Sequence, residues 1–183
     1  MSKKEFDDFL KKEVQKKNPH FDWDAEKKIW IAHIEKLFAD VETWLKEYTT
    51  TRKIKIEYNK LDIHEETLGT YTVNELKIII NDKVAKLTPI GTILIGTRGR
   101  ADLSGSTGIV KFILADKKAT GPKIEFKESI SDAEKQKSLE NKKEQPKVQI
   151  DWVWKITSNP PRIKYTELNQ ETFLQCLMEV IDG

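Results

Sequence analysis

The stretch that decides the fold is residues 70–90, TYTVNELKIIINDKVAKLTPI. Two extended runs, 70–80 and 83–90, meet there across Asn81 and Asp82, which tolerate positive φ and suit a tight two-residue turn. Strands joined by so short a turn run antiparallel, because a parallel pair needs a long crossover connection. The sequence therefore predicts an antiparallel hairpin at the centre of the fold.

More extended runs lie on both sides of this hairpin. They cover 53–59, 92–103, 107–115, 123–127, 147–157 and 162–166, most of them joined by short connections. The glycines between positions 91 and 108 predict bulges or sharp bends in the strands that carry them. We therefore expect a strongly curved antiparallel sheet of about six to eight strands.

Two helices are predicted to pack against that sheet. The longer one covers 25–48, with Asp24 as its N-cap and an apolar stripe in steps of three and four: Trp30, Ile34, Leu37, Val41, Trp44 and Tyr48. The second begins near position 170 and is capped by Asn169. Together with the sheet, these helices predict an α+β fold.

Domain organisation follows from length and composition. Residues 1–183 suit a single α+β domain, with a helical arm at 1–20 and a mobile charged insert at 129–146. Lys and Arg number 32 against 30 Asp and Glu, so the net charge is only +2 and a uniformly basic nucleic-acid binder is disfavoured. The single cysteine, Cys176, falls in the apolar pattern of the second helix and is expected to be buried.

We expect a cytoplasmic location. The charged N-terminal stretch has no apolar segment of the kind that export signals contain, and no run approaches the ~20 apolar residues of a membrane span. A single cysteine also fits a reducing compartment. The three histidines His20, His33 and His64 are not spaced as metal ligands, so no metal and no cofactor is predicted.

The best-posed candidate site is the row Arg98, Arg100 and Asp102. If 93–103 is one extended strand, these side chains share the face opposite Ile95 and Leu103. Two guanidinium groups in such a row could clamp a phosphate or a carboxylate. The alternative is a surface ladder of Arg and Asp paired across neighbouring strands.

Other chemistry-bearing residues have simpler interpretations. Trp152 and Trp154 could stack on bases, but they share a face with Ile150 and Ile156, so core packing with Trp30 and Trp44 is favoured. The glycine-rich segment lacks the spacing of nucleotide-binding loops. His64 could act as a general base, yet the Glu65–Gly69 stretch beside it is typical of a turn.

The run PIGTILIGTRGRADLSG, residues 89–105, resembles a stretch found in small hypothetical proteins of bacteria. The resemblance covers about a tenth of the chain and carries no function with it. It implies a bacterial, cytoplasmic origin.

Three functions remain open on the sequence alone. The first is a non-catalytic interaction protein, an adaptor or an immunity- or antitoxin-like protein, that binds a protein partner. The second is an enzyme or sensor that binds a phosphorylated or nucleotidic ligand through Arg98 and Arg100. The third is nucleic-acid binding through the Lys-rich region 117–147.

Overall fold

The computed structural model describes residues 22–66, 68–92, 97–122 and 150–182. The elements are α2 (Trp23–Thr50), β1 (Lys55–Glu65), β2 (Gly69–Ile80), β3 (Lys83–Gly91), β4 (Gly99–Ser104), β5 (Ile109–Asp116), β6 (Trp152–Thr157), β7 (Tyr165–Glu167) and α4 (Gln170–Asp182). The predicted arm at 1–20, strand at 123–127 and charged insert at 129–146 lie outside the described residues.

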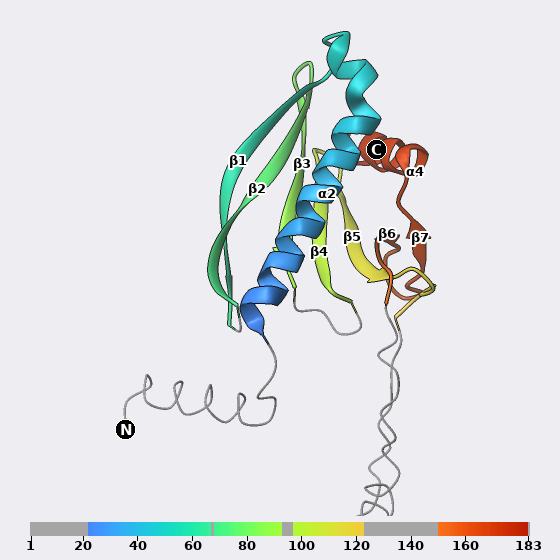
Figure 1. Ribbon diagram of the computed structural model, residues 1–183. Coiled ribbons are helices and arrows are strands. Elements are labelled where there is room, and N and C mark those ends of the chain that lie inside the picture. The colour runs from blue at the N-terminus through green and yellow to red at the C-terminus, as the bar shows by residue number, and fades with distance from the viewer. Residues whose placement is uncertain (1–21, 67, 93–96, 123–149, 183) are drawn as a thin grey trace, which may run out of the picture.

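The strands form one open sheet in the order β1-β2-β3-β4-β5-β6-β7, and every neighbouring pair is antiparallel (Figure 1). The α+β class and the antiparallel sheet are thereby confirmed. Asn81 has a φ of 54° in the predicted turn between β2 and β3. The strong curvature expected from the glycines stays a prediction.

The N-cap of α2 differs from the prediction. Asp22, not Asp24, accepts a hydrogen bond from the Ala25 N–H at 3.0 Å, so the helix begins at Trp23. Asp24 instead lies in the first turn with Glu26, where a carboxylate favours the helix dipole. An aspartate can occupy either position, so composition alone could not choose between the two.

The strand ends also differ from the predicted ranges. The single strand expected at 92–103 is wrong, because β4 begins only at Gly99 and the pairing of β3 with β4 shifts register between Pro89 and Gly91. The first strand is longer than expected and runs to Glu65, which places His64 and Glu65 in β1 and not in a turn. Long-range pairing with β2 extends β1 through residues whose local pattern is ambiguous.

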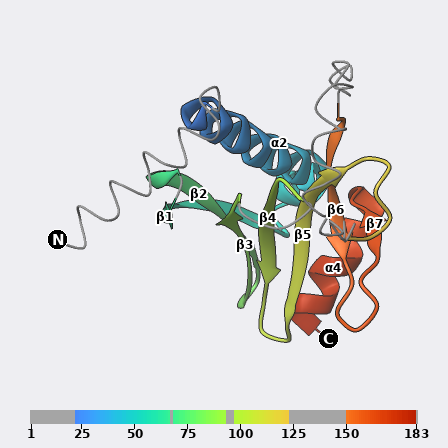
Figure 2. The same cartoon turned by 90° about the horizontal axis from the view of Figure 1, so that it is seen from below.

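Both helices pack on the same face of the sheet, hereafter the inner face. Figures 1 and 2 show α2 crossing that face obliquely. Trp30 and Trp154 are buried in the shared core, at 1% and 8% exposure, whereas Trp44 and Trp152 are partly buried against it. The common core predicted for the four tryptophans is thus confirmed for Trp30 and Trp154 and only partial for Trp44 and Trp152.

Helix α4 completes the core beside α2. The Phe173 ring lies between those of Trp44 and Phe112, with centroid distances of 5.4 and 6.3 Å. Asn169 caps the helix as predicted, since its Oδ1 accepts from the Thr172 N–H at 3.0 Å. Cys176 is buried, and this burial raises the pKa of its thiol to about 11.

Candidate functional site

The predicted row of Arg98, Arg100 and Asp102 has its members engaged by different partners. Arg100 donates from Nε and Nη2 to the two carboxylate oxygens of Asp102, at 2.7 and 2.6 Å. Arg98 precedes β4, pairs with Glu26 of α2 and lies over the Trp152 ring, 5.4 Å from its centroid. Because Arg98 reaches α2 while Arg100 alternates with buried Gly99 and Ala101 on the outer face, the two guanidinium groups diverge.

Other charged side chains on the outer face of the sheet are paired in the same way. On neighbouring strands, Glu75 accepts from the Thr88 hydroxyl at 2.8 Å and lies 3.8 Å from the Lys86 ammonium. The Arg100–Asp102 pair fits this pattern of a surface ladder. No contact of Arg98 or Arg100 favours a ligand, and the anion clamp stays a prediction.

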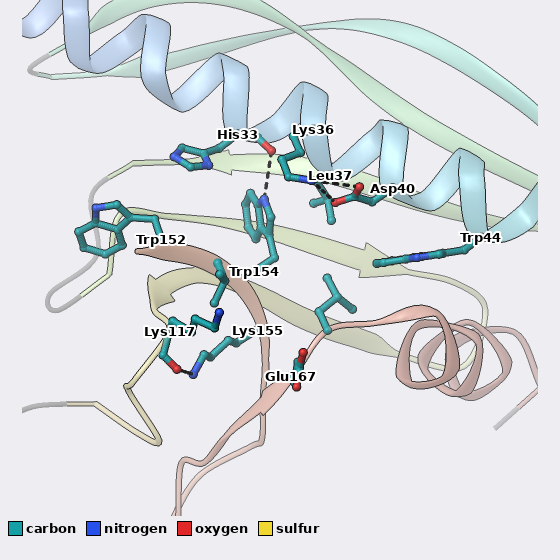
Figure 3. A pocket seen from close by; sticks show the side chains of 12 residues that line it. His33, Lys36, Leu37, Asp40, Trp44, Lys117, Trp152, Trp154, Lys155 and Glu167 are labelled. Carbon is teal, nitrogen blue, oxygen red and sulfur yellow. Dashed lines mark hydrogen bonds and ion pairs between the residues drawn. The ribbon is translucent and has the colours of Figure 1, made fainter. Parts of the chain in front are cut away.

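A cleft of about 440 Å³ lies where α2 passes the edge of β6 (Figure 3). The lining residues are His33, Lys36, Leu37, Asp40 and Trp44 from α2, Lys117 from the loop after β5, Trp152, Val153, Trp154 and Lys155 from β6, and Glu167 and Leu168 at the end of β7. Aromatic and apolar side chains form its walls, and charged groups lie at its rim. This combination is typical of binding sites.

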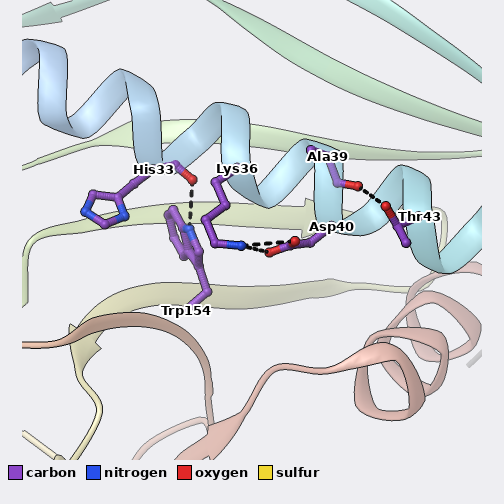
Figure 4. Close-up of polar contacts among 6 residues, drawn as sticks. All are labelled: His33, Lys36, Ala39, Asp40, Thr43 and Trp154. Carbon is purple, nitrogen blue, oxygen red and sulfur yellow. Dashed lines mark hydrogen bonds and ion pairs between the residues drawn. The ribbon is translucent and has the colours of Figure 1, made fainter.

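Trp154 joins the two walls of the cleft. Its indole Nε1 donates to the main-chain carbonyl of His33 at 3.0 Å, which ties β6 to the middle of α2 (Figure 4). Its ring also packs at a tilt against Trp30, with centroids 5.9 Å apart. The position of α2 over the sheet edge is therefore set by Trp154, and the cleft has one rigid wall.

The α2 rim of the cleft is polar. Lys36 and Asp40 form an ion pair at 3.0 Å, one helical turn apart, and the Thr43 hydroxyl donates to the Ala39 carbonyl at 2.8 Å (Figure 4). Burial lowers the pKa of His33, and the positive charges of Arg98 and Lys36 lower it further. The imidazole is therefore mainly neutral at pH 7.

One edge of β6 is uncovered along the cleft. Strand β7 pairs only with residues 155–157 of β6. The Lys117 N–H donates to the Asp151 carbonyl at 2.8 Å, so the alternation of the antiparallel ladder turns the main-chain groups of Trp152 and Trp154 away from β5. In the described part of the chain, the N–H groups of both tryptophans and the Trp152 carbonyl have no backbone partner.

Lys155 is a buried cation on the same edge, at 8% exposure. Its Nζ donates to the carbonyls of Lys117 and Ala119 at 2.7 and 2.6 Å, which holds the loop after β5 against the outer face. Among the described residues no carboxylate lies within ion-pair distance of this ammonium. Two of its three N–H groups are used by the carbonyls, and one is left.

Glu65, which the sequence placed beside a possible general base, has a structural position. Its carboxylate is buried and accepts from the Tyr71 hydroxyl, and from the N–H and hydroxyl of Thr92 at 3.0 and 2.6 Å. Burial, then the Glu65 hydrogen bond, raises the pKa of Tyr71. Since these donors satisfy the carboxylate, Glu65 joins the ends of β1, β2 and β3, while His64 bonds Thr70 at 2.9 Å outside this network.

Sequence reasoning did not identify the cleft. His33 and Trp154 are 121 positions apart, and nothing in either local pattern indicates that they meet. Lys155 alternates with Trp154 and Ile156 and therefore resembles a solvated outer-face residue. The loop that buries its ammonium belongs to another segment, so no local signal could have marked it.

Searches outside the chain and for metal or membrane features returned nothing positive. No protein-family model, no curated protein and no solved structure matches this chain. Within the described ranges, no group of His, Cys, Asp and Glu side chains is arranged to hold a metal ion. None of the helices in those ranges is long and apolar enough to cross a membrane.

Proposed function

We propose that the protein is a non-catalytic interaction protein that binds a macromolecular partner by adding an extended segment of that partner to the β6 edge. The observation that carries this proposal is the uncovered main chain of Trp152 and Trp154 along a cleft of about 440 Å³. Addition of a strand to an exposed sheet edge is a recurring mode of peptide recognition, because main-chain hydrogen bonds supply affinity.

The charged groups of the cleft support binding over catalysis. Lys36 is paired with Asp40, Lys117 lies 3.6 Å from Asp151, and Lys155 is held by two carbonyls. The lining residues include no serine, threonine or cysteine that the neutral His33 could activate. The side chains are arranged to shape and anchor a segment.

Amide hydrogen exchange tests the edge directly. In the free protein, we expect the Trp152 and Trp154 amides to exchange faster than the Val153 amide, which faces β5 in the ladder. A bound segment would slow exchange at both tryptophans and leave Val153 unchanged. Equal protection at all three positions in the free protein would mean that the edge is already covered.

Site-specific crosslinking identifies what binds there. A photoreactive phenylalanine derivative at Lys36, on the cleft rim, is compared with the same group at Lys46, which is exposed on α2 outside the cleft lining. In lysate of the source cells, we expect adducts from position 36 that are absent from position 46, each mapping to one recurrent extended segment. Equal adducts from both positions would contradict a specific cleft ligand.

A further inference from the structure

The cleft has two chemically different sides for an added strand. On the inner side, toward α2, it presents Leu37, Trp44 and Trp154. On the outer side it presents Lys117 and Lys155, which alternate with the inward tryptophan along the β5–β6 ladder. Successive side chains of an added strand would point to these two sides in turn.

The buried ammonium of Lys155 indicates which charge the outer side accepts. A buried charge is costly unless a partner compensates it, and carbonyl oxygens supply only partial charge. Lys155 has one N–H beyond its two bonds to carbonyls. The nearby Lys117 is 69% exposed, and its distance to Asp151 is a long 3.6 Å, so its charge is also available.

The negative groups of the cleft limit how acidic the ligand can be. Asp40 is neutralised by Lys36 at the opposite rim. Glu167 faces Lys155 across the β6–β7 register and is exposed, so it would repel a second carboxylate near the end of β7. The balance favours one acidic residue beside Lys117 and Lys155, flanked by apolar residues.

Resting on the proposed function, we infer that the cleft takes an extended polypeptide segment with an apolar–acidic–apolar alternation. The acidic side chain meets the Lys155 and Lys117 ammonium groups, and the apolar side chains pack against Leu37, Trp44 and Trp154. The main chain of the segment bonds Trp152 and Trp154, which sets the register that brings these side chains to their places.

The probe is a library of random heptapeptides displayed on phage and selected on the full-length protein. We expect the enriched peptides to share an acidic residue with an apolar residue on each side. A synthetic peptide of the enriched sequence is then compared with its Glu→Gln or Asp→Asn counterpart. Loss of the charge-assisted bond is expected to weaken binding about tenfold to a hundredfold.

Two variants attribute that difference to the two lysines. In Lys155→Met, the acidic peptide should bind no better than its amide counterpart. Because this change also frees the loop at Ala119, Lys117→Gln serves as a second variant that leaves the fold alone and reduces the difference. Lys86→Gln, on the outer face of β3, is the charge-matched control and should retain the full difference.

The outcomes separate this inference from the proposed function. Enriched peptides that slow amide exchange at Trp152 and Trp154 but carry no acidic residue would overturn the inference and leave strand addition standing. An acidic preference that is unchanged in both Lys155→Met and Lys117→Gln would overturn it as well. A selection that yields no peptide able to slow exchange at those amides would overturn both.

Discussion

Single residues set how closely α2 approaches the sheet, and Gly99 is the clearest case. A Cβ built on Gly99 would lie 2.1 Å from Cζ3 of the Trp30 ring, closer than real atoms approach. Trp30 is 1% exposed and packed on Trp154, so the ring has no space to move into. The absent side chain at position 99 therefore leaves room for the largest buried residue of the helix.

Gly99→Ala should lower the free energy of unfolding by about 1–3 kcal/mol, the usual cost of overpacking a core. The measurement is urea denaturation followed by tryptophan fluorescence. Gly108→Ala is the matched control, because a Cβ there meets nothing within 4 Å, and its effect should stay within about 0.5 kcal/mol. Equal stability of the two variants would mean that the helix can shift away from β4.

Among the elements, α4 shows how a short helix is held at both ends. At its start, Asn169 accepts from the Thr172 N–H. At its end, the Thr107 N–H donates to the Val180 carbonyl and the Ser106 hydroxyl to the Ile181 carbonyl, both at 3.0 Å. The β4–β5 turn thus satisfies carbonyls that the last turn of a helix leaves unpaired.

Asn169→Ala should cost about 1 kcal/mol, the usual effect of removing an N-cap side chain. The chemical denaturation midpoint is expected to fall while its slope stays constant. Gln175→Ala, at an exposed position inside the same helix, is the control and should change little. If Asn169→Ala were as stable as this control, the Thr172 hydroxyl, which contacts Asn169, would be replacing the cap.

In the molecule as a whole, one core cluster joins both helices to the sheet. It includes Leu45 of α2, Phe173 of α4, Phe112 of β5 and Val73 of β2, all buried. Strands that neighbour each other in the sheet are also neighbours in sequence, so the β1–β7 meander brings its parts together without a crossover connection. A core shared in this way couples the helices to the strands.

We expect one cooperative unfolding transition. Far-UV circular dichroism reports the backbone, and tryptophan fluorescence reports the core around Trp30, Trp44 and Trp154, so the two should have the same midpoint. Phe173→Leu should lower both midpoints together, because this side chain contacts α2 and β5 at once. Separate midpoints would mean that a helix detaches from the sheet before the sheet unfolds.

The sequence by itself determined the elements whose signals are local. The Asn81–Asp82 turn, the apolar stripe of α2 and the Asn169 cap each depend on residues a few positions apart, and each was predicted. Antiparallel order followed from short connections, which leave the chain no other way to pair. The N-cap was misplaced from Asp22 to Asp24 because both residues carry the same group within the same few positions.

Only the tertiary structure decided the candidate site. The cleft requires α2 to cross the β6 edge, where Trp154 bonds the His33 carbonyl, and it requires β7 to end before it covers Trp152. Lys155 becomes a buried cation because the loop at 117–119 closes over it. These contacts join segments far apart in the chain, and their geometry depends on how the helix and the sheet pack together, which no local periodicity encodes.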